Sequence, residues 1–220
     1  MTTRAAPVVL AATSGTGKTT LARKLVEDFR RYVFSVSVTT RSPRRGERDG
    51  IDYSFVVREE FEARVAAGEF AEWAEVHDAL YGTPHAEIDE AAERGEHVVL
   101  DIDVQGALQI RKSVPDSKLI FVLPPSVGIM MTRLTGRGTE NAAGIARRLR
   151  SAMAELRAVS TFDHVVVNDD LDECVGDIRG IVQGGREPQS VPEQRVEEFR
   201  AEIARILEDE YAEYVNSTEE

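Results

Sequence analysis

The chain has 220 residues, enough for one sizeable hydrophobic core and a small inserted subdomain but not for a second independent domain. Apolar residues make up 42% of it and charged residues 30%, as in soluble globular proteins, and no apolar run approaches the ~20 residues that cross a bilayer. A net charge of −12 argues against nonspecific nucleic-acid binding, which requires a basic surface. We therefore expect neither a membrane nor a nucleic acid among its partners.

The cysteine content and the N-terminus indicate the compartment. Cys174 is the only cysteine, which excludes an intramolecular disulfide and a cysteine-based zinc cluster. It shares a helical face with Ile178, and this favours a core thiol over a reactive one. The first apolar run is short and does not read as a signal peptide. Together these features predict a cytoplasmic protein.

The negative charge is unevenly distributed along the chain. Residues 186–220 hold four arginines against eleven acidic residues, so this segment carries −7 and the remainder −5. Arginines cluster locally at 41–48 and at 133–150. Local basic clusters in a mildly acidic body indicate a small polyanionic ligand.

Residues 7–20 read as a strand, a phosphate-binding loop and the start of a helix. Such a loop turns successive backbone N–H groups inward, where the positive end of the helix helps them to cradle phosphate oxygens. Lys18 is expected to reach the β- and γ-phosphates of a nucleotide, and the Thr19 hydroxyl to ligate Mg²⁺. The loop residues predicted to bind this nucleotide are Ser14, Gly15, Thr16, Gly17, Lys18, Thr19 and Thr20.

The loop departs at one position from the pattern G-x-x-x-x-G-K-[ST]. Ala12 stands where the first glycine belongs, which requires a backbone conformation open to a Cβ. The alternative to a phosphate loop is a plain turn between strand and helix, but the buried strand before it and the apolar helical face after it favour phosphate binding.

Residues 34–96 are predicted to form a small β-rich insertion between α/β units. Apolar and polar residues alternate in it as in half-buried strands, and the connecting loops are rich in glycine, proline and charge. The predicted elements are a strand at 33–39, a loop at 40–50, a strand at 53–57, a helix at 58–67, a strictly alternating strand at 70–76 and a helix to about residue 94.

Two buried strands, at 97–103 and 118–123, alternate with helices, and this predicts a parallel sheet with ligands at the carboxyl ends of its strands. Asp101 ends the first of them as a Walker-B-type carboxylate does and is expected to orient Mg²⁺ through its water shell. Asp103 points to the same side of the strand. The alternative for this pair is capping of the following helix.

The C-terminal third is predicted to be mainly helical. Its elements are a helix at 129–137, a long amphipathic helix at 141–159, a last strand with its loop at 163–170, a linker at 184–192 and one more helix beyond it.

Seven motifs follow one another with a recognisable order and spacing. They are Ser-Val-Ser-Val-Thr-Thr-Arg-Ser-Pro-Arg-Arg-Gly-Glu at 35–47, Gly-Ile-Asp-Tyr-Ser-Phe at 50–55, Glu-Phe-Ala-Glu-Trp-Ala at 69–74, Tyr-Gly-Thr-Pro at 81–84, Leu-Asp-Ile-Asp-Val-Gln-Gly at 100–106, Arg-Gly-Thr-Glu at 137–140 and Val-Asn-Asp-Asp-Leu at 167–171. Together they strongly resemble the guanylate kinase family, over residues 7–183. The resemblance implies an α/β fold of the P-loop NTPase type, a parallel sheet flanked by helices with a small β-rich NMP-binding insertion and a helical lid at about 133–148.

The resemblance also implies the activity, a Mg²⁺-dependent phosphorylation of GMP, and of dGMP with it, by ATP. The residues it implies for GMP binding are Ser37, Arg41, Arg44, Tyr53, Glu72, Tyr81, Thr83, Asp101 and Asp103. Among them, two arginines and two tyrosines grip the phosphate. Glu72 reads guanine, because the N1–H and the exocyclic amine are adjacent donors that one carboxylate accepts together. Adenine lacks this pair of donors and is rejected.

On the ATP side, the resemblance implies that Arg133, Arg137 and Arg148 close over the phosphates like an arginine finger supplied in cis. Asn168 matches a position near the adenine ring, and Thr13 replaces the proline usual in the family. The residues implied for catalysis are Lys18, Arg41, Arg137 and Arg148.

The predicted organisation is a guanylate kinase domain at 1–185, with its core at 1–33 and 97–185, followed by an acidic helical extension at 186–220. One alternative is an interaction module that has lost catalysis, against which Lys18 and Thr19 argue. Another is a kinase of a different phosphorylated acceptor, such as a ribose bisphosphate, against which Ser37 and Glu72 argue. Both a monomer and a homodimer are compatible with the sequence.

Overall fold

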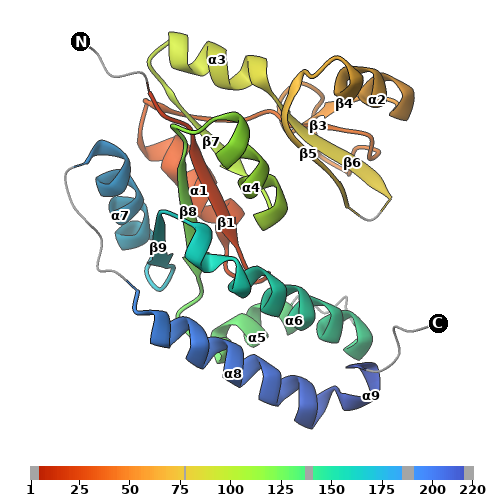
Figure 1. The fold of residues 1–220 in the computed structure, drawn as a ribbon, viewed down its shortest axis with the longest axis vertical. Helices are drawn as coiled ribbons and strands as arrows, with labels where there is room; N and C mark the ends of the chain where they lie inside the picture. Colours follow the sequence, from red (N-terminus) through yellow and green to blue (C-terminus); the bar gives the residue numbers. More distant parts are fainter. Residues whose placement is uncertain (1–4, 77, 137–140, 185–190, 216–220) are drawn as a thin grey trace. The chain divides into compact units, whose positions relative to one another are not determined.

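The structure is a computed structural model that describes residues 5–76, 78–136, 141–184 and 191–215 (Figure 1). It comprises two compact units. The first consists of Met1–Leu10 and Ala22–Leu119, and the second of Ala11–Leu21 and Ile120–Glu220. The chain therefore crosses between the units three times, after Leu10, after Leu21 and after Leu119.

Five short apolar segments form a sheet in the order β2-β7-β1-β8-β9. They are β1 (Val8–Ala12), β2 (Tyr32–Phe34), β7 (His97–Asp101), β8 (Lys118–Leu123) and β9 (His164–Val167). The strand pairs β1–β7, β2–β7 and β8–β9 are parallel. Every residue of β1 is buried, as expected for a strand of a parallel sheet with both faces covered. The predicted parallel sheet is confirmed.

Helices follow the strands as the alternating pattern predicts. α1 (Lys18–Asp28) buries Leu21 and Leu25, α3 (His85–Glu93) packs on β7, and α4 (Val104–Ser113) begins two residues after β7 ends. In the second unit, α7 (Leu171–Gln183) packs on β9. It buries Cys174, and burial raises the pKa of this thiol to about 12, so Cys174 is a core residue.

The first unit also contains a second sheet, of four strands in the order β4-β3-β6-β5. These are β3 (Val38–Thr39), β4 (Ser54–Phe55), β5 (Phe70–Val76) and β6 (Ala79–Pro84). One face of this sheet packs on α2 (Arg58–Ala66) through a core of Val38, Phe61, Phe70 and Leu80, in which the rings of Phe61 and Phe70 stack with centroids 4.5 Å apart.

The prediction of one strand over 33–39 is wrong, because the chain changes sheets within it. Residues up to Phe34 pair with β7, and the Ser35 N–H still donates to the Val99 carbonyl at 3.1 Å. From Ser37 onward the partners are those of the other sheet, since the Ser37 carbonyl accepts a hydrogen bond from the Ser54 N–H. Alternation describes each half correctly and cannot show where a strand passes from one sheet to another.

The prediction of strict alternation along β5 is also wrong. Phe70 lies opposite Pro84 and Glu72 opposite Thr83, so two steps along β5 match one step along β6. This is a β-bulge, and it places the Phe70 and Glu72 side chains on opposite faces of the sheet. Phe70 consequently enters the core under α2, whereas Glu72 lies on the face of Thr83 and Tyr81.

The second unit is mainly helical beyond β8. Its helices are α5 (Val127–Thr135), α6 (Ala142–Arg157), the 3-10 turn Val159–Thr161, α7, α8 (Glu193–Glu210) and α9 (Ala212–Val215). α8 packs on both α5 and α6 through a buried stripe of Val196, Phe199, Ile203 and Leu207. Within the described ranges, no helix is long and apolar enough to cross a membrane.

We expect the truncation Ile203→Ala to destabilise the protein by about 2–4 kcal/mol, because this fully buried side chain would leave a cavity in the seam between α8 and its partners. Urea unfolding measures the change, and Glu202→Ala, at the neighbouring exposed position, is the control. A loss no larger than that of the control would mean that α8 does not pack on the second unit in solution.

Candidate active site

The phosphate loop connects β1 to α1 in the second unit and ends at the first residue of the helix, Lys18. Gly15 and Gly17 adopt φ values of +84° and +87°, which a residue with a Cβ rarely adopts. A Cβ on Gly17 would also lie 3.0 Å from the Asn168 Nδ2 atom. The two glycines that the sequence retains are therefore the two that the backbone of the loop requires.

The position of Ala12 does not require a glycine. It is the last residue of β1 and is buried. Among the described residues, the only one besides glycine with a positive φ is Asp78. The position of the missing glycine is thus extended strand, and the departure from the motif causes no strain here.

Two side chains from elsewhere in the second unit hold the loop through the Thr16 carbonyl. It accepts hydrogen bonds from Arg133 Nη1 at 2.9 Å and from Asn168 Nδ2 at 2.8 Å. Because the C=O and N–H of a trans peptide point in opposite directions, these bonds turn the Gly17 N–H away from Arg133 and Asn168. Within the loop, the Thr16 hydroxyl donates to the Thr13 carbonyl at 2.7 Å. The Thr13 hydroxyl also lies 3.0 Å from the Thr16 hydroxyl, a contact that the proline usual in the family could not make.

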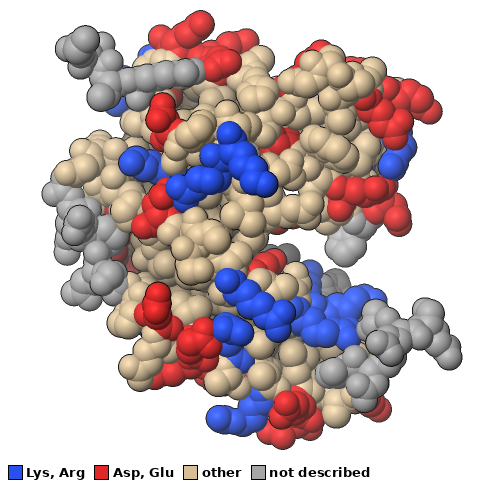
Figure 2. Space-filling view, viewed as in Figure 1, with Lys and Arg blue, Asp and Glu red and all other residues tan. Residues whose placement is uncertain are grey.

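The other residues predicted for the ATP side lie on the same unit. Ser14 and Lys18 are half-buried, and Thr19 and Thr20 are exposed in the first turn of α1. Arg148 lies half-buried on α6, where basic side chains gather on the surface of this unit (Figure 2). The predicted lid residue Arg137 lies outside the described residues. Asn168, predicted near adenine, is buried against the loop.

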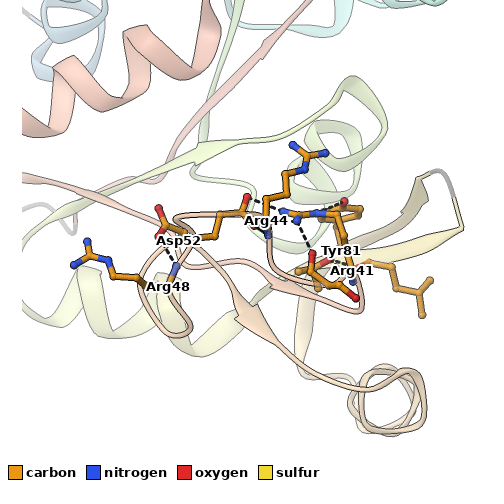
Figure 3. Close-up of polar contacts among 9 residues, drawn as sticks. Arg41, Arg44, Arg48, Asp52 and Tyr81 are labelled. Atoms are coloured by element: carbon orange, nitrogen blue, oxygen red, sulfur yellow. Dashed lines mark hydrogen bonds and ion pairs between the residues drawn. The ribbon is translucent and has the colours of Figure 1, made fainter. Parts of the chain in front are cut away.

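A second group of predicted residues gathers in the first unit around Arg41 (Figure 3). Its Nε donates to the Tyr81 hydroxyl at 3.1 Å, and its guanidinium carbon lies 5.2 Å from the centre of the Tyr53 ring. The Tyr53 and Tyr81 rings are 6.1 Å apart. Residues far apart in the sequence, predicted to bind one phosphate, thus meet around a single guanidinium.

Glu47 belongs to this cluster, although the sequence analysis assigned it no role. Its two oxygens accept bonds from Arg41 Nη1 at 2.9 Å and Nη2 at 3.0 Å, and one also accepts from the Arg44 N–H at 2.7 Å. The bidentate contact with Arg41 lowers the pKa of Glu47 and raises that of Arg41. The signal was a glutamate six residues after Arg41 in an arginine-rich loop.

The loop that carries Glu47 is folded by hydrogen bonds of its own. Asp52 accepts from the Arg48 N–H at 2.8 Å, and the Glu47 N–H donates to the Arg44 carbonyl at 3.0 Å (Figure 3). The Arg44 side chain is exposed at this loop. These bonds hold Arg44 in a compact turn, and Glu47 links this turn to Arg41.

Glu72 is only 5% exposed, although it is a carboxylate. The Thr83 hydroxyl donates to its Oε1 at 2.6 Å. Burial raises the pKa of Glu72 to about 7; the Thr83 hydroxyl bond opposes this rise, and the charge of Asp103 adds to it. A buried carboxyl with a raised pKa and a neutral partner is a group prepared to accept hydrogen bonds from a ligand.

The two aspartates after β7 differ in their surroundings. Asp101 is the last residue of the strand and is half-buried. Asp103 is the N-cap of α4, and its Oδ1 accepts from the Gly106 N–H at 2.7 Å. Capping, the alternative considered for this pair, therefore occurs at Asp103, which is exposed and free to contact a ligand through its other oxygen. Ser37, also predicted to read guanine, is half-buried just before β3.

The guanylate kinase family model matches residues 4–184. The chain belongs to the guanylate kinase family. A guanylate kinase of Nitratidesulfovibrio vulgaris is 50% identical over 172 residues, which are 78% of this chain and 83% of that one. One of Corynebacterium diphtheriae is 46% identical over 181 residues, 81% of this chain and 95% of that one.

A solved structure supports the same assignment. The guanylate kinase of Anaplasma phagocytophilum superimposes with a TM-score of 0.66 at 32% identity, covering 94% of this chain and 95% of its own. The predicted resemblance and the predicted α/β fold are thereby confirmed, and this chain is an enzyme of the guanylate kinase kind.

The raised pKa of Glu72 predicts a pH-dependent stability. Below about pH 4.5 the Glu72 carboxyl is protonated in both the folded and the unfolded protein. As the pH rises through about 7, the folded protein must ionise this carboxyl in a buried site. The free energy of unfolding then falls by ~3 kcal/mol. Glu72→Gln keeps the shape without the charge. In the absence of ligand we expect this variant to match the wild type at pH 5 and to exceed it at pH 8.

Urea unfolding at the two pH values measures the difference, with Glu75→Gln as the control because Glu75 lies on the same strand but is exposed. Parallel pH dependences for the wild type and Glu72→Gln would contradict the burial of a titrating carboxyl.

Proposed function

We propose that the protein transfers the γ-phosphoryl group of ATP to GMP, with Mg²⁺ as cofactor and dGMP as a second acceptor, in purine nucleotide metabolism. The observation that carries the proposal is the buried Glu72 carboxyl beside Thr83 and Asp103. Membership in the guanylate kinase family supports it.

The chemistry of these side chains suits guanine. Ionised Glu72 accepts two hydrogen bonds side by side, and guanine offers N1–H and an exocyclic amine in that arrangement. Thr83 already occupies one lone pair of Oε1 and so fixes the plane of the carboxylate. Adenine presents an acceptor at N1 and would leave the buried carboxylate without a donor. The loss of binding free energy is then far larger than for a missing contact in water.

The cluster around Arg41 suits the phosphate of the same nucleotide. Arg41, Arg44, Tyr53 and Tyr81 supply guanidinium and phenol donors for its oxygens. Glu47, Tyr81 and the Ser42 carbonyl hold the Arg41 guanidinium in place, which leaves one Nη2 N–H of Arg41 for the phosphate. None of the proposed contacts requires the ribose 2′-hydroxyl, and this is why dGMP is proposed as an acceptor.

On the donor side, the loop N–H groups, Lys18 and the positive end of α1 would bind the phosphates of ATP. Arg133, Arg137 and Arg148 would neutralise the charge that develops during transfer. The reaction requires alignment and charge neutralisation, because the acceptor phosphate oxygen attacks the γ-phosphorus directly and no covalent enzyme intermediate is formed.

The donor set is compatible with Mg²⁺. No group of three or more His, Cys, Asp or Glu side chains that could hold a metal occurs in the described ranges. Mg²⁺ keeps most of its waters and is bound through substrate phosphates and one or two oxygen ligands, so a closed protein cage is not expected. The Thr19 hydroxyl, and Asp101 through water, would supply the ligands, and the ion would lower the charge of the phosphates during transfer.

The experiment that tests the proposal is ADP release from ATP with GMP, dGMP, AMP, UMP, ribose 1,5-bisphosphate or no acceptor, with Mg²⁺ and with EDTA. We expect Mg²⁺-dependent release with GMP and dGMP only. Lys18→Met should abolish release while GMP binding by calorimetry persists. GMP binding without release in the wild type would favour the interaction module, and release with the bisphosphate alone would favour a different acceptor.

Glu72→Gln should raise the KM for GMP roughly 10²-fold, because an amide offers one acceptor and turns an N–H₂ group toward a donor of guanine. The KM for ATP should stay within about twofold, since Glu72 lies on the other unit from the phosphate loop. Steady-state kinetics with each substrate varied in turn measures both constants. An equal loss for the two nucleotides would refute the role assigned to Glu72.

A further inference from the structure

One face of α4 is directed toward strand β5 of the first unit. The face consists of Gly106, Gln109 and Ser113, spaced by three and four residues as neighbours on one side of a helix are. Each of these residues lies against β5 at or beside Glu72. The helix therefore meets the strand at the position that the proposed function assigns to guanine recognition.

The Gln109 side chain forms hydrogen bonds with both backbone groups of Trp73, the residue after Glu72. Its Nε2 donates to the Trp73 carbonyl at 2.8 Å, and its Oε1 accepts from the Trp73 N–H at 3.2 Å. β5 is the edge strand of its sheet, so these backbone groups have no strand partner on that side. The side-chain amide thus satisfies them as another strand would, and it fixes the peptide that follows Glu72.

Ser113 holds the residue on the other side of Glu72. Its hydroxyl donates to the Ala71 carbonyl at 2.7 Å. Ala71 is the residue of the β-bulge that has no partner on β6. The bulge brings Glu72 to this face of the sheet, and the hydrogen bond from α4 stabilises the backbone at the bulge itself.

Gly106 leaves the space that the carboxylate occupies. A Cβ at this position would lie 2.8 Å from Glu72 Oε2, closer than such atoms approach, and 3.3 Å from its carboxyl carbon, which is a tight contact. Gly106 has no positive φ that would call for glycine, and glycine costs a helix about 1 kcal/mol relative to alanine. The reason for glycine here is therefore the close approach of Glu72.

We propose that Gly106, Gln109 and Ser113 are positioning residues that set the depth and direction of the Glu72 carboxylate and thereby the selectivity for guanine. The proposal rests on the proposed function. None of the three is assigned a contact with the nucleotide; they act through Glu72 and its strand.

The first test compares Gly106→Ala with Gly176→Ala, a matched control in the interior of α7 where a Cβ would meet nothing within 4 Å. Both substitutions gain the same helix propensity. We expect Gly106→Ala to raise the KM for GMP ~10-fold or more without changing the KM for ATP, because the end of the Glu72 side chain is the atom group that must shift. Gly176→Ala should leave both constants unchanged.

The second test is a double-variant cycle. With the Glu72 side chain removed in Glu72→Ala, Gly106→Ala should add no further loss in GMP affinity by calorimetry, because nothing remains for its Cβ to displace. Additive losses would mean that Gly106 acts independently of Glu72 and would overturn the proposal. Gln109→Met, which keeps the length but not the hydrogen bonds, should behave in the same way.

A readout without nucleotide separates this proposal from the proposed function. In protein labelled with ¹³C at glutamate carboxyls, the Glu72 resonance should change its titration in Gly106→Ala and not in Gly176→Ala. If the wild type lacks activity with GMP but the titration of the Glu72 resonance changes in Gly106→Ala, the proposed function fails and the positioning role stands. If the resonance and the KM for GMP both stay unchanged in Gly106→Ala, the positioning role fails.

Discussion

Burial of the Glu72 carboxyl is the constraint on which the first unit's site depends. A carboxylate removed from water is costly unless hydrogen bonds replace its hydration, and here the side-chain partner is the neutral Thr83 hydroxyl. Part of the cost remains, as the raised pKa of Glu72 indicates. In the proposed function, a ligand with two adjacent donors would remove this cost, so the burial that destabilises an ionised Glu72 would also favour guanine.

The two predicted anion-binding regions use different physics. In the second unit, the phosphate loop relies on backbone dipoles, and Arg133 and Asn168 serve it by holding the Thr16 carbonyl. In the first unit, a guanidinium fork is oriented by a carboxylate, Glu47, which lowers the local net charge but fixes the geometry. A guanidinium held in this way would lose less entropy on binding a phosphate than a flexible one.

The sequence predicted what depends on local patterns: the phosphate loop, most helices and the buried strands of the parallel sheet. Family motifs also identified Arg41, Tyr53 and Tyr81, which the structure brings together from separate elements. Two features were not predicted from the sequence, because they depend on partners that are distant in sequence. The change of sheet near Ser35 is determined by strand pairing, and the bulge at Ala71 by α4 and β6. Alternation in the sequence records burial, not the register of the neighbouring strand.

The overall charge of −12 is compatible with the proposed polyanionic substrates because of where the charge lies. Over half of it belongs to residues 186–220. In α8, the apolar stripe faces α5 and α6, and acidic residues such as Glu197, Glu198 and Glu202 are exposed to water, where salt screens them beyond about 10 Å. Binding of a phosphate is decided within a few ångströms, by N–H groups, Lys18 and arginines. The net charge therefore disfavours nonspecific binding of extended nucleic acids and leaves binding of a nucleotide possible.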